Sequence, residues 1–416
     1  MRFCCVNLGC KVNRVETDAV AASLLHQGNQ ESSEQDADLI IVNTCTVTGE
    51  AEKKTRKAVR QALRANDHAR VVVTGCAAAV DAPFYQSLSL RVDFVPKGKL
   101  MEQVLEHAAV TQRAQVLATP AFRTRVGVKV QDGCNNACTY CIVHVARGRS
   151  VSRPAEEVIG ECVALAQAGV REIVLSGINL GSYSYYDPYS SATLHLPDLL
   201  ERILDQTQGQ SPDGAPLVRY RIGSVEPKDV SPELMALMTA NPGRICRHLH
   251  LPLQSGSSRV LREMARPYDA DFFLDLVTRF REQVPGLALS TDVIVGFPGE
   301  TDEDFQHTLE VCRSCGFMKI HVFPYSKRKG TPAAARTDQV APEVKANRAA
   351  ALRTLSDELA LVDRATRAGI TEWALIEQQG RATVESYHEV AVETHLPAGS
   401  LIPYTWPVQS HAGLPE

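Results

Sequence analysis

Strand-like and helix-like runs alternate at the start of this chain, and the alternation limits which folds are open to it. Strand-like runs cover Arg2–Leu8, Asp38–Val42 and Arg70–Thr74, and helical stretches cover Val12–His26 and Glu50–Arg64. Strands that alternate with helices in this way predict a parallel sheet with crossover connections. We therefore expect the chain to begin with a parallel-sheet α/β domain.

A cysteine follows each of these three strand-like runs at once. Cys10 lies in LGCKVN, Cys45 in NTCTVT and Cys76 in TGC. The loops that leave the carboxyl ends of parallel strands gather on one edge of the sheet, where ligands bind. We therefore expect the three cysteines to converge in space as metal ligands. The alternative is that they are three buried structural cysteines.

A second alternating series begins near Arg125 and predicts six more strand–helix units. Helix starts are marked by Ser231-Pro232-Glu233, an N-cap with a first-turn proline, and by a capping box that begins at Thr301. Six units suggest a partial (β/α)6 barrel rather than a complete barrel of eight units. The strand candidates are Gly127–Gln131, Glu172–Ser176, Arg219–Gly223, Arg247–Leu251, Ala288–Val295 and Lys319–Pro324.

The end of the chain changes character. Glu343–Ala368 has apolar residues at helical spacing and predicts one long helix. After Gly369 the pattern becomes short and alternating, which predicts a small β-barrel with strands at Glu372–Glu377, Arg381–Ser386, Glu389–Glu393 and Leu401–Val408. The predicted domains are therefore residues 1–115, 120–368 and 369–416.

The composition favours an ordinary cytoplasmic protein. No stretch approaches the roughly 20 apolar residues of a membrane span, and the start, Met1-Arg2-Phe3-Cys4-Cys5, lacks the apolar core of a secretory signal. The chain has twelve cysteines, and in a reducing compartment clustered cysteines are better interpreted as metal ligands or catalytic groups than as a disulfide framework. A net charge of −4 neither indicates nor excludes a nucleic-acid partner, because a local basic face is enough to bind phosphates.

The densest cysteine motif is Cys134-x3-Cys138-x2-Cys141, on a loop after the first barrel strand. Three thiolates hold three irons of a 4Fe-4S cluster, whereas a cluster ligated by protein alone normally uses four. The fourth iron would then be open to a cofactor or substrate. The competing interpretation is a zinc site with His144 as the fourth ligand, but the spacing matches neither common zinc pattern.

This motif, with Tyr140 before the third cysteine, resembles that of the radical S-adenosylmethionine (radical SAM) enzymes. The resemblance implies that the open iron chelates S-adenosylmethionine and reduces it to a 5′-deoxyadenosyl radical, with Cys134, Cys138 and Cys141 in the catalytic centre. It also implies the partial barrel. Cofactor contacts are then expected after the barrel strands, at Gly177, Asn179, Ser224, Glu226, Gly296 and Gly299.

The full chain is similar to the methylthiotransferase family. The matching segments are GCKVNRVETD, NTCTVT, VVTGC, CIVHVARGRSVSRP, SGINLGSY, RIGSVEP, HLPLQSGS, DVIVGFPGET and FPYSKRKGTPAA. His144-Val145 departs from the family pattern of a proline and an aromatic residue. The resemblance implies an auxiliary 4Fe-4S cluster on Cys10, Cys45 and Cys76 and a C-terminal RNA-binding TRAM domain, although Pro403 and Pro407 make its last strand irregular.

The opening CKVN followed by Glu16-Thr17-Asp18 most resembles the branch that acts on threonylcarbamoyladenosine beside the tRNA anticodon. The resemblance implies methylthiolation of carbon 2 of that base, with a tRNA anticodon stem–loop as partner and an electron donor such as flavodoxin or ferredoxin. The alternatives are isopentenyladenosine, a ribosomal-protein aspartate, or a non-catalytic iron–sulfur protein that binds RNA or transfers electrons.

Two sets of basic residues are candidates for RNA contact. One set lies on a predicted helix and the other flanks the cysteine loop; they are Lys53, Lys54, Arg56, Lys57, Arg60 and Arg64, and Arg123, Arg125, Arg147, Arg149 and Arg153. The remaining cysteines, Cys4, Cys5, Cys162, Cys246, Cys312 and Cys315, are expected to pack in the core. For His248 and His250, burial with ordinary hydrogen bonds is the expectation.

Overall fold

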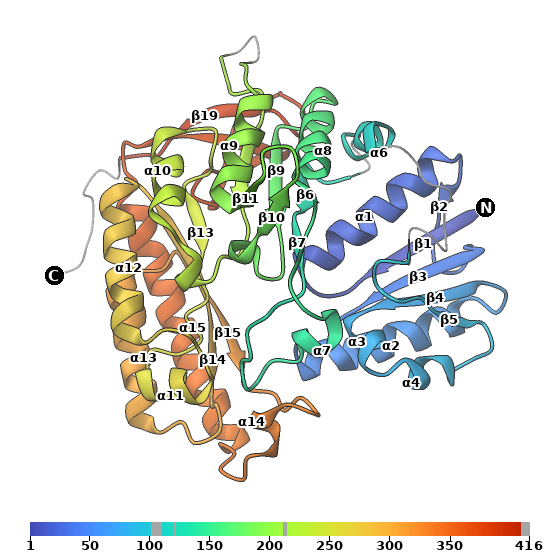
Figure 1. Ribbon diagram of the computed structural model, residues 1–416, viewed down its shortest axis with the longest axis horizontal. Helices are drawn as coiled ribbons and strands as arrows, with labels where there is room; N and C mark the ends of the chain where they lie inside the picture. Colours follow the sequence, from blue (N-terminus) through green and yellow to red (C-terminus); the bar gives the residue numbers. More distant parts are fainter. Residues whose placement is uncertain (101–109, 120–121, 211–213, 409–416) are drawn as a thin grey trace.

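The computed structural model describes residues 1–100, 110–119, 122–210 and 214–408. The predicted domain boundary at residue 120 and the last residues of the predicted third domain, 409–416, lie outside the described residues. The chain forms an N-terminal α/β unit, a central curved sheet with helices on its outer side, and a C-terminal antiparallel sheet (Figure 1). No helix among the described residues is long and apolar enough to cross a membrane.

The N-terminal unit is a five-stranded parallel sheet in the order β2-β1-β3-β4-β5. Its central strand, LIIVNT, is buried on both faces because helices cover both sides. The three predicted strands are present, and two short edge strands join them. The elements are β1 (Arg2–Asn7), α1 (Lys11–His26), β2 (Gln30–Glu31), β3 (Leu39–Thr44), α2 (Gly49–Ala65), β4 (Arg70–Gly75), α3 (Cys76–Val80), α4 (Ala82–Gln86), β5 (Val92–Phe94) and α6 (Val110–Leu117).

Six parallel strands form the central unit. They are β6 (Arg125–Lys129), β9 (Glu172–Ser176) and β12 (Arg219–Ile222) in one sheet, and β13 (His248–His250), β14 (Ala288–Val295) and β15 (Lys319–Pro324) in a second. Parallel bridges from Tyr220 to Ile245 and from Ser224 to His250 join the two sheets. The six predicted strands therefore form one continuous arc, which is open between β6 and β15 in the described residues.

Helices pack on the outer side of the arc around the largest apolar core of the protein. The Thr301 side chain accepts a hydrogen bond from the Asp304 backbone, and the Asp304 side chain accepts one from the Thr301 backbone, so the predicted capping box is confirmed. These helices are α8 (Ala155–Gln167), α9 (Leu196–Gln206), α10 (Pro232–Ala240), α11 (Ser258–Glu263), α12 (Ala270–Gln283), α13 (Asp302–Cys315) and α15 (Pro342–Ala365). Smaller elements are β7 (Gln131–Asp132), α7 (Val143–Arg147), β8 (Val151–Ser152), η1 (Leu180–Ser182), β10 (Ser184–Asp187), β11 (Ala192–His195), η2 (Pro227–Asp229) and α14 (Pro332–Ala335).

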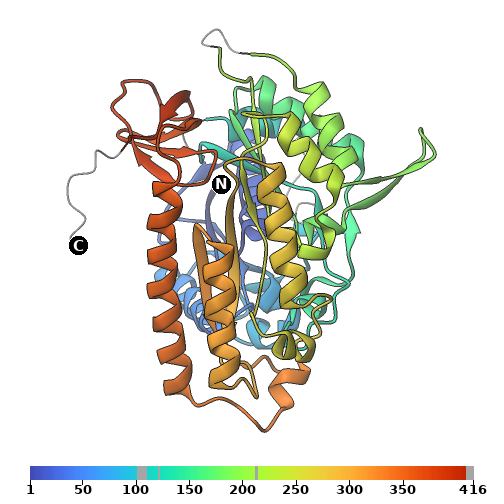
Figure 2. The ribbon, with the colours of Figure 1, turned by 90° about the vertical axis from the view of Figure 1, so that its left-hand side faces the viewer.

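The C-terminal unit is a four-stranded antiparallel sheet at the end of the long helix α15 (Figure 2). Its strands, in the order β18-β17-β16-β19, are β16 (Thr371–Gln378), β17 (Arg381–Val384), β18 (Glu389–Ala391) and β19 (Leu401–Thr405). The expectation of a closed barrel is wrong, because β18 and β19 do not pair in the described residues. Pro403 lies in the edge strand β19, where a missing backbone N–H is tolerated.

Buried charges attach this sheet to the central arc. Glu172 on β9 pairs with Arg219 and Arg221 on β12, and all three side chains are fully buried. Arg219 donates to the carbonyl oxygen of Trp373 at 2.5 Å, and Arg221 donates to that of Glu385 at 2.9 Å. Each arginine therefore bonds both to Glu172 and to the C-terminal sheet, so the sheet completes the hydrogen bonding of two buried cations.

Candidate functional site

The fold brings Cys10, Cys45 and Cys76 to one edge of the N-terminal sheet. They follow β1, β3 and β4, which are neighbouring parallel strands in register. Cys45 and Cys76 are buried, and Cys10 is exposed. Gly9 has φ +104°, and a Cβ there would lie 2.7 Å from the Cys45 Sγ. Only glycine suits that conformation and allows the first loop to approach the second so closely.

Asn13, three residues after Cys10, fixes the loops of this first triad. Its side-chain amide donates to the carbonyl oxygens of Leu8 at 2.8 Å and Thr44 at 2.9 Å. Asn43 donates in turn to the Asn13 carbonyl oxygen at 2.9 Å. The residues that precede Cys10 and Cys45 are therefore held by one buried side chain. From the sequence, Asn13 was only part of the CKVN family motif, and its role in holding the loops was not predicted.

Arg147, on the short helix α7, connects this triad to the central unit. Its Nε donates to the Cys76 Sγ at 3.3 Å, and its Nη2 donates to the Asn13 Oδ1 at 2.5 Å. Its Nη1 forms ion pairs with Asp132 at 2.7 Å and Glu16 at 3.4 Å. With 1% of its side chain exposed, Arg147 is not available to RNA, so the prediction of an RNA contact is wrong for this residue.

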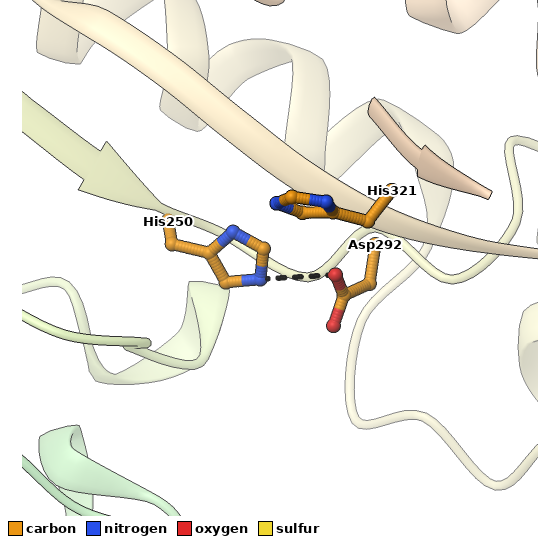
Figure 3. A group of neighbouring side chains, drawn as sticks. All are labelled: His250, Asp292 and His321. Atoms are coloured by element: carbon orange, nitrogen blue, oxygen red, sulfur yellow. Dashed lines mark ion pairs between the residues drawn. The ribbon is translucent and has the colours of Figure 1, made fainter. Parts of the chain in front are cut away.

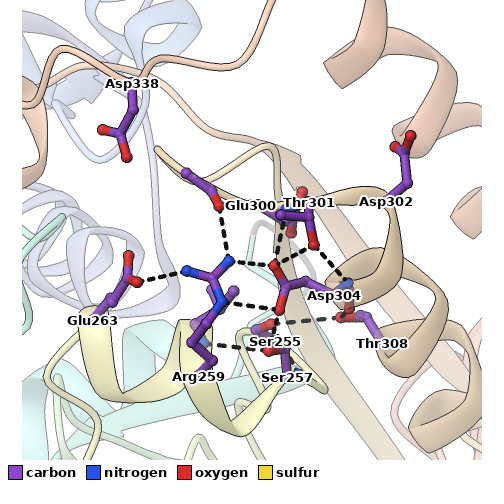
Figure 4. Close-up of polar contacts among 12 residues, drawn as sticks. Ser255, Ser257, Arg259, Glu263, Glu300, Thr301, Asp302, Asp304, Thr308 and Asp338 are labelled. Atoms are coloured by element: carbon purple, nitrogen blue, oxygen red, sulfur yellow. Dashed lines mark hydrogen bonds and ion pairs between the residues drawn. The ribbon is translucent and has the colours of Figure 1, made fainter.

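The second triad, Cys134, Cys138 and Cys141, lies on the loop before α7. The backbone N–H of Thr139 donates to the Met264 carbonyl oxygen at 3.0 Å, and its Oγ1 donates to that of Glu263 at 2.9 Å. Glu263 belongs to a network in which Arg259 also pairs with Asp304 (Figure 4). The loop is therefore attached to the end of α11, and through Glu263, Arg259 and Asp304 to the start of α13.

Each thiol of the second triad accepts a hydrogen bond from a nearby N–H group. Asn136 and Val143 donate backbone N–H groups at 3.4 Å to Cys134 and Cys141, respectively. Arg266 donates to the Cys138 Sγ at 3.3 Å and forms an ion pair with Glu226. Donors and a cation around sulfur stabilise a thiolate, which is the form that binds metal.

Burial favours the protonated form of four of the six thiols. It raises the pKa of Cys45 to about 11 and that of Cys141 to about 12, and it also raises the pKa values of Cys76 and Cys134. A bound metal centre would reverse this effect, because its positive charge deprotonates a coordinating thiol. Grouped, largely buried free thiols with N–H donors therefore fit iron–sulfur ligation.

A single zinc ion fits the triads less well. Tetrahedral Zn–S bonds of about 2.3 Å place sulfur atoms roughly 3.8 Å apart. In the described residues, one group of three His, Cys, Asp or Glu donors has all its ligand atoms within 4.8 Å of one another, and it contains no cysteine and not His144. The sulfur atoms are therefore spread more widely than one ion requires, as a multi-iron group would need.

Two of the predicted cofactor contacts lie directly after β9. Gly177 follows the strand, and Asn179 is buried. The Asn179 Oδ1 and the Asn136 Nδ2 of the cysteine loop are buried without a hydrogen-bond partner in the described residues. Buried polar atoms normally have partners, so the unpaired acceptor after β9 and the unpaired donor on the cysteine loop are each suited to contact a bound polar ligand.

The other predicted contacts already have partners within the protein. Ser224 forms the bridge to His250, and Glu226 pairs with Arg266. The backbone N–H of Gly296 donates to Glu300 at 2.6 Å, and that of Gly299 donates to the Asp338 carbonyl oxygen at 2.8 Å. Roles for these four residues in cofactor binding stay predictions.

A cavity of about 990 Å³ adjoins the first triad, between α1, the start of the arc and the C-terminal sheet. Its lining includes Cys10 and Ser176, which directly precedes Gly177, together with five basic residues and Tyr387. Those basic residues are Lys11, Arg14, Arg123, Arg125 and Arg171. All three units of the chain therefore contribute to one hollow that reaches a predicted cluster ligand.

The remaining cysteines and the basic residues predicted to contact RNA differ in how exposed their side chains are. Cys162, Cys246, Cys312 and Cys315 are buried as predicted, while Cys4 and Cys5 are half-buried. On α2 the side chains of Lys53, Lys54, Lys57, Arg60 and Arg64 are exposed, as are Arg123 and Arg149 near the cysteine loop. Arg125 and Arg153 form ion pairs with Glu377 and Glu161, both at 2.8 Å.

Two family models match the chain. Residues 128–312 match the Radical SAM superfamily, and residues 2–95 match the Uncharacterized protein family UPF0004. The threonylcarbamoyladenosine tRNA methylthiotransferase MtaB of Chlamydia pneumoniae is 39% identical over 90% of this chain and 87% of the relative. That of Bacillus subtilis is 38% identical over 85% of this chain and 80% of the relative.

This chain belongs to the radical SAM methylthiotransferase family. A more distant relative is the tRNA-2-methylthio-N(6)-dimethylallyladenosine synthase of Desulfotalea psychrophila, which is 33% identical over 89% of this chain and 87% of the relative. The methylthiotransferase is therefore most similar to the MtaB branch. Membership in the superfamily implies a 4Fe-4S cluster and S-adenosylmethionine as cofactors.

A solved structure supports the fold of the methylthiotransferase. The radical S-adenosylmethionine methyltransferase TsrM from Kitasatospora setae superposes with a TM-score of 0.53 at 16% identity, covering 80% of this chain and 75% of TsrM. At this identity the similarity concerns the fold alone. It extends beyond the central arc, because the matched share of the chain is larger than that unit.

Proposed function

We propose that this protein methylthiolates carbon 2 of N6-threonylcarbamoyladenosine next to the anticodon of tRNA. Cys134, Cys138 and Cys141 would hold the radical SAM cluster, and Cys10, Cys45 and Cys76 would hold a second 4Fe-4S cluster. The observation that carries the proposal is Arg147, which follows the second triad in sequence and donates a hydrogen bond to Cys76 of the first triad. The two triads are therefore neighbours, as a shared substrate requires.

The choice of base rests on the relatives. The MtaB proteins of Chlamydia pneumoniae and Bacillus subtilis, at 39% and 38% identity, are named for threonylcarbamoyladenosine. The relatives named for dimethylallyladenosine are 33–36% identical over comparable lengths. The two ranges meet at 36%, the identity of the MtaB protein of Thermotoga maritima, so the difference is modest, but it has the same direction as the CKVN opening at Cys10.

The chain's own residues supply binding and orientation. The bound clusters and S-adenosylmethionine would provide the electron transfer, the radical and the methylthio group. Arg266 and Arg147 donate to Cys138 and Cys76 and so keep one thiol of each triad oriented. The Asn179 Oδ1, which lacks a partner in the described residues, is suited to accept a hydrogen bond from the cofactor's amino group.

The cavity beside Cys10 suits an RNA substrate. Lys11, Arg14, Arg123 and Arg125 contribute positive charge to its lining, and Tyr387 contributes an aromatic ring. Cations attract phosphates without reading sequence, and an aromatic face accepts a stacked base. We assign tRNA as the substrate, and an external donor such as flavodoxin or ferredoxin as the source of electrons.

Nucleoside mass spectrometry of tRNA from cells that lack this protein tests the proposal. The expected result is loss of the 2-methylthio form of threonylcarbamoyladenosine, with the unmodified threonylcarbamoyl nucleoside retained. A control strain that expresses Cys312→Ala should be normal, because Cys312 is buried in the apolar core on α13 and belongs to neither triad. If the methylthio form of isopentenyladenosine is lost instead, isopentenyladenosine is the substrate. If neither methylthio nucleoside changes, the proposal is refuted.

A further inference from the structure

Three side chains on neighbouring strands of the arc form a cluster apart from the cysteines: His250 on β13, Asp292 on β14 and His321 on β15 (Figure 3). Asp292 lies opposite His321 in the strand register, and His250 lies opposite Ser290, two residues before Asp292. Alternate residues of a strand share a face, so all three project to the same side. Their ligand atoms all lie within 4.8 Å of one another.

Ser290 fixes the orientation of His250. The His250 Nδ1 lies 3.0 Å from the Ser290 Oγ, and its Nε2 lies 3.3 Å from the Asp292 Oδ1. Ser290 is also 3.0 Å from the Nε2 of the buried His248. Metal-binding histidines commonly have the second ring nitrogen held by a hydrogen bond in this way. The His250 Nε2 is therefore aimed at the carboxylate by a hydrogen-bonded chain.

His321 lies opposite Asp292 on the neighbouring strand β15. Its ring centre is 5.7 Å from that of His250, and among the described residues its imidazole has no hydrogen-bond partner. Lys319, the cation two residues earlier on the strand, forms an ion pair with Asp357 on α15 at 4.0 Å. One carboxylate and two imidazoles, one of which is unpaired among the described residues, are thus mutually close, and this arrangement suits a cation placed between the three.

We propose that His250, Asp292 and His321 bind one divalent transition-metal ion, with Zn²⁺ as the best match. Two imidazoles and a carboxylate suit Zn²⁺, Co²⁺ or Fe²⁺, whereas Mg²⁺ and Ca²⁺ prefer oxygen ligands. Tetrahedral zinc with bonds of about 2.1 Å separates its donors by roughly 3.4 Å, close to the 3.3 Å between His250 and Asp292. The exposed His321 completes the set by rotating its ring.

Such a site would have three protein ligands and one open position. Three-ligand zinc sites are the kind that bind a water molecule or a substrate atom in the fourth position. The site lies on the arc strands and uses no cysteine, so its ligands are distinct from those of both triads. Its ligands come from β13, β14 and β15, and Ser290 on β14 orients one of them.

The test is zinc binding by the anaerobically reconstituted full-length protein. The protein is dialysed against micromolar ZnCl₂, and zinc and iron are then counted by mass spectrometry. Wild type should retain about one zinc more per chain than Asp292→Asn or His321→Ala. The exposed His307, on α13, provides the matched control, and His307→Ala should retain the same zinc as wild type. Ser290→Ala should weaken binding by about 10–100-fold.

Iron content separates this site from the cysteine triads. All variants should hold as much iron as wild type, because none of the altered residues is a cysteine. Equal zinc in wild type, Asp292→Asn and His321→Ala would overturn the proposal. Absence of zinc from the wild type would do the same, and would leave the cluster as the hydrogen-bonded chain His248–Ser290–His250–Asp292.

Discussion

Arg147 donates a hydrogen bond to the Cys76 sulfur at 3.3 Å although 71 positions separate the two residues in sequence. Arg147 ends the helix that follows the Cys134–Cys141 loop, and Cys76 begins the helix that follows β4. The same guanidinium reaches Asn13, which pins the loops around Cys10 and Cys45. One side chain therefore connects the segments that carry both cysteine triads.

Replacement of Arg147 should loosen the cluster of the first triad. Arg147→Ala removes the hydrogen bond to the Cys76 Sγ and the hydrogen bond to the Asn13 Oδ1. Partners of metal ligands typically contribute about 10–100-fold in metal affinity. We expect about half of the iron to be lost to a chelator much faster than from wild type. Arg149→Ala, at an exposed neighbouring position, should behave as wild type, and equal rates in both variants would contradict the role of Arg147.

Each cysteine triad should hold about half of the iron in the reconstituted protein. Anaerobic reconstitution should load about eight irons per chain, and alanine at all three of Cys10, Cys45 and Cys76 should remove about half of them. The same change at Cys134, Cys138 and Cys141 should remove the other half. Cys312→Ala with Cys315→Ala is the control, because both residues are buried in the helical core. Full iron in the Cys10–Cys45–Cys76 variant would show that this triad holds no cluster.

Protonation of Glu172 should lower the free energy of unfolding at acid pH. Burial opposes its ionisation, but Arg219 and Arg221 outweigh burial and lower its pKa from 4.5 to about 2. The unfolded chain therefore binds a proton more readily, and the stabilisation by Glu172 is complete above pH 4.5 and is lost as the pH falls toward 2.

Glu172→Gln tests this dependence. Loss of one partner from a buried ion pair costs about 3–5 kcal/mol, so the midpoint of thermal unfolding should fall clearly at pH 7. The difference in unfolding midpoint between Glu172→Gln and wild type should become smaller as the pH falls from 4.5 to 3. Glu157→Gln, a largely exposed carboxylate, should change little. A difference in unfolding midpoint that does not change with pH would contradict the lowered pKa of Glu172.

Asn179 should contribute to cofactor binding. Its Oδ1 is buried and has no partner in the described residues, so a bound molecule that donates a hydrogen bond would gain about 1.4 kcal/mol there. Asn179→Ala should therefore raise the Kd for S-adenosylmethionine about tenfold in equilibrium dialysis. Asn241→Ala, at the end of α10, is the control. An unchanged Kd for Asn179→Ala would remove this residue from the cofactor site.

The order of strands and helices was predictable because parallel strands and covering helices have distinct local patterns. The runs around Ile40 and Val72 are continuously apolar, as strands buried on both faces must be. The position of Cys10, Cys45 and Cys76 on one edge followed from that topology. The closed C-terminal barrel was wrong, because closure depends on whether β18 and β19 meet, and strand patterns do not determine which edges pair.

The roles of single polar residues were harder to predict. Arg147 looked like a surface cation because a sequence gives charge but not burial; its partners Asp132, Glu16 and Cys76 come from three different segments. Likewise, the alternation of His248 and His250 predicted ordinary burial. The contact with Asp292 depends on the strand register, which no local pattern records.

The most direct test of the two-cluster account compares Cys45→Ala with Cys138→Ala. Cys45 is buried beside Cys76, and Cys138 accepts a hydrogen bond from Arg266, so each change removes one thiol of one triad. Anaerobic protein, S-adenosylmethionine, reductant and tRNA bearing threonylcarbamoyladenosine are combined. The 5′-deoxyadenosine and the methylthio nucleoside are then measured in the same sample.

Cys138→Ala should form neither product, whereas Cys45→Ala should still form 5′-deoxyadenosine but no methylthio nucleoside. Wild type should form both products, with the methylthio group on threonylcarbamoyladenosine. Methylthio nucleoside formed by Cys45→Ala at the wild-type rate would contradict the account, even if both clusters are present.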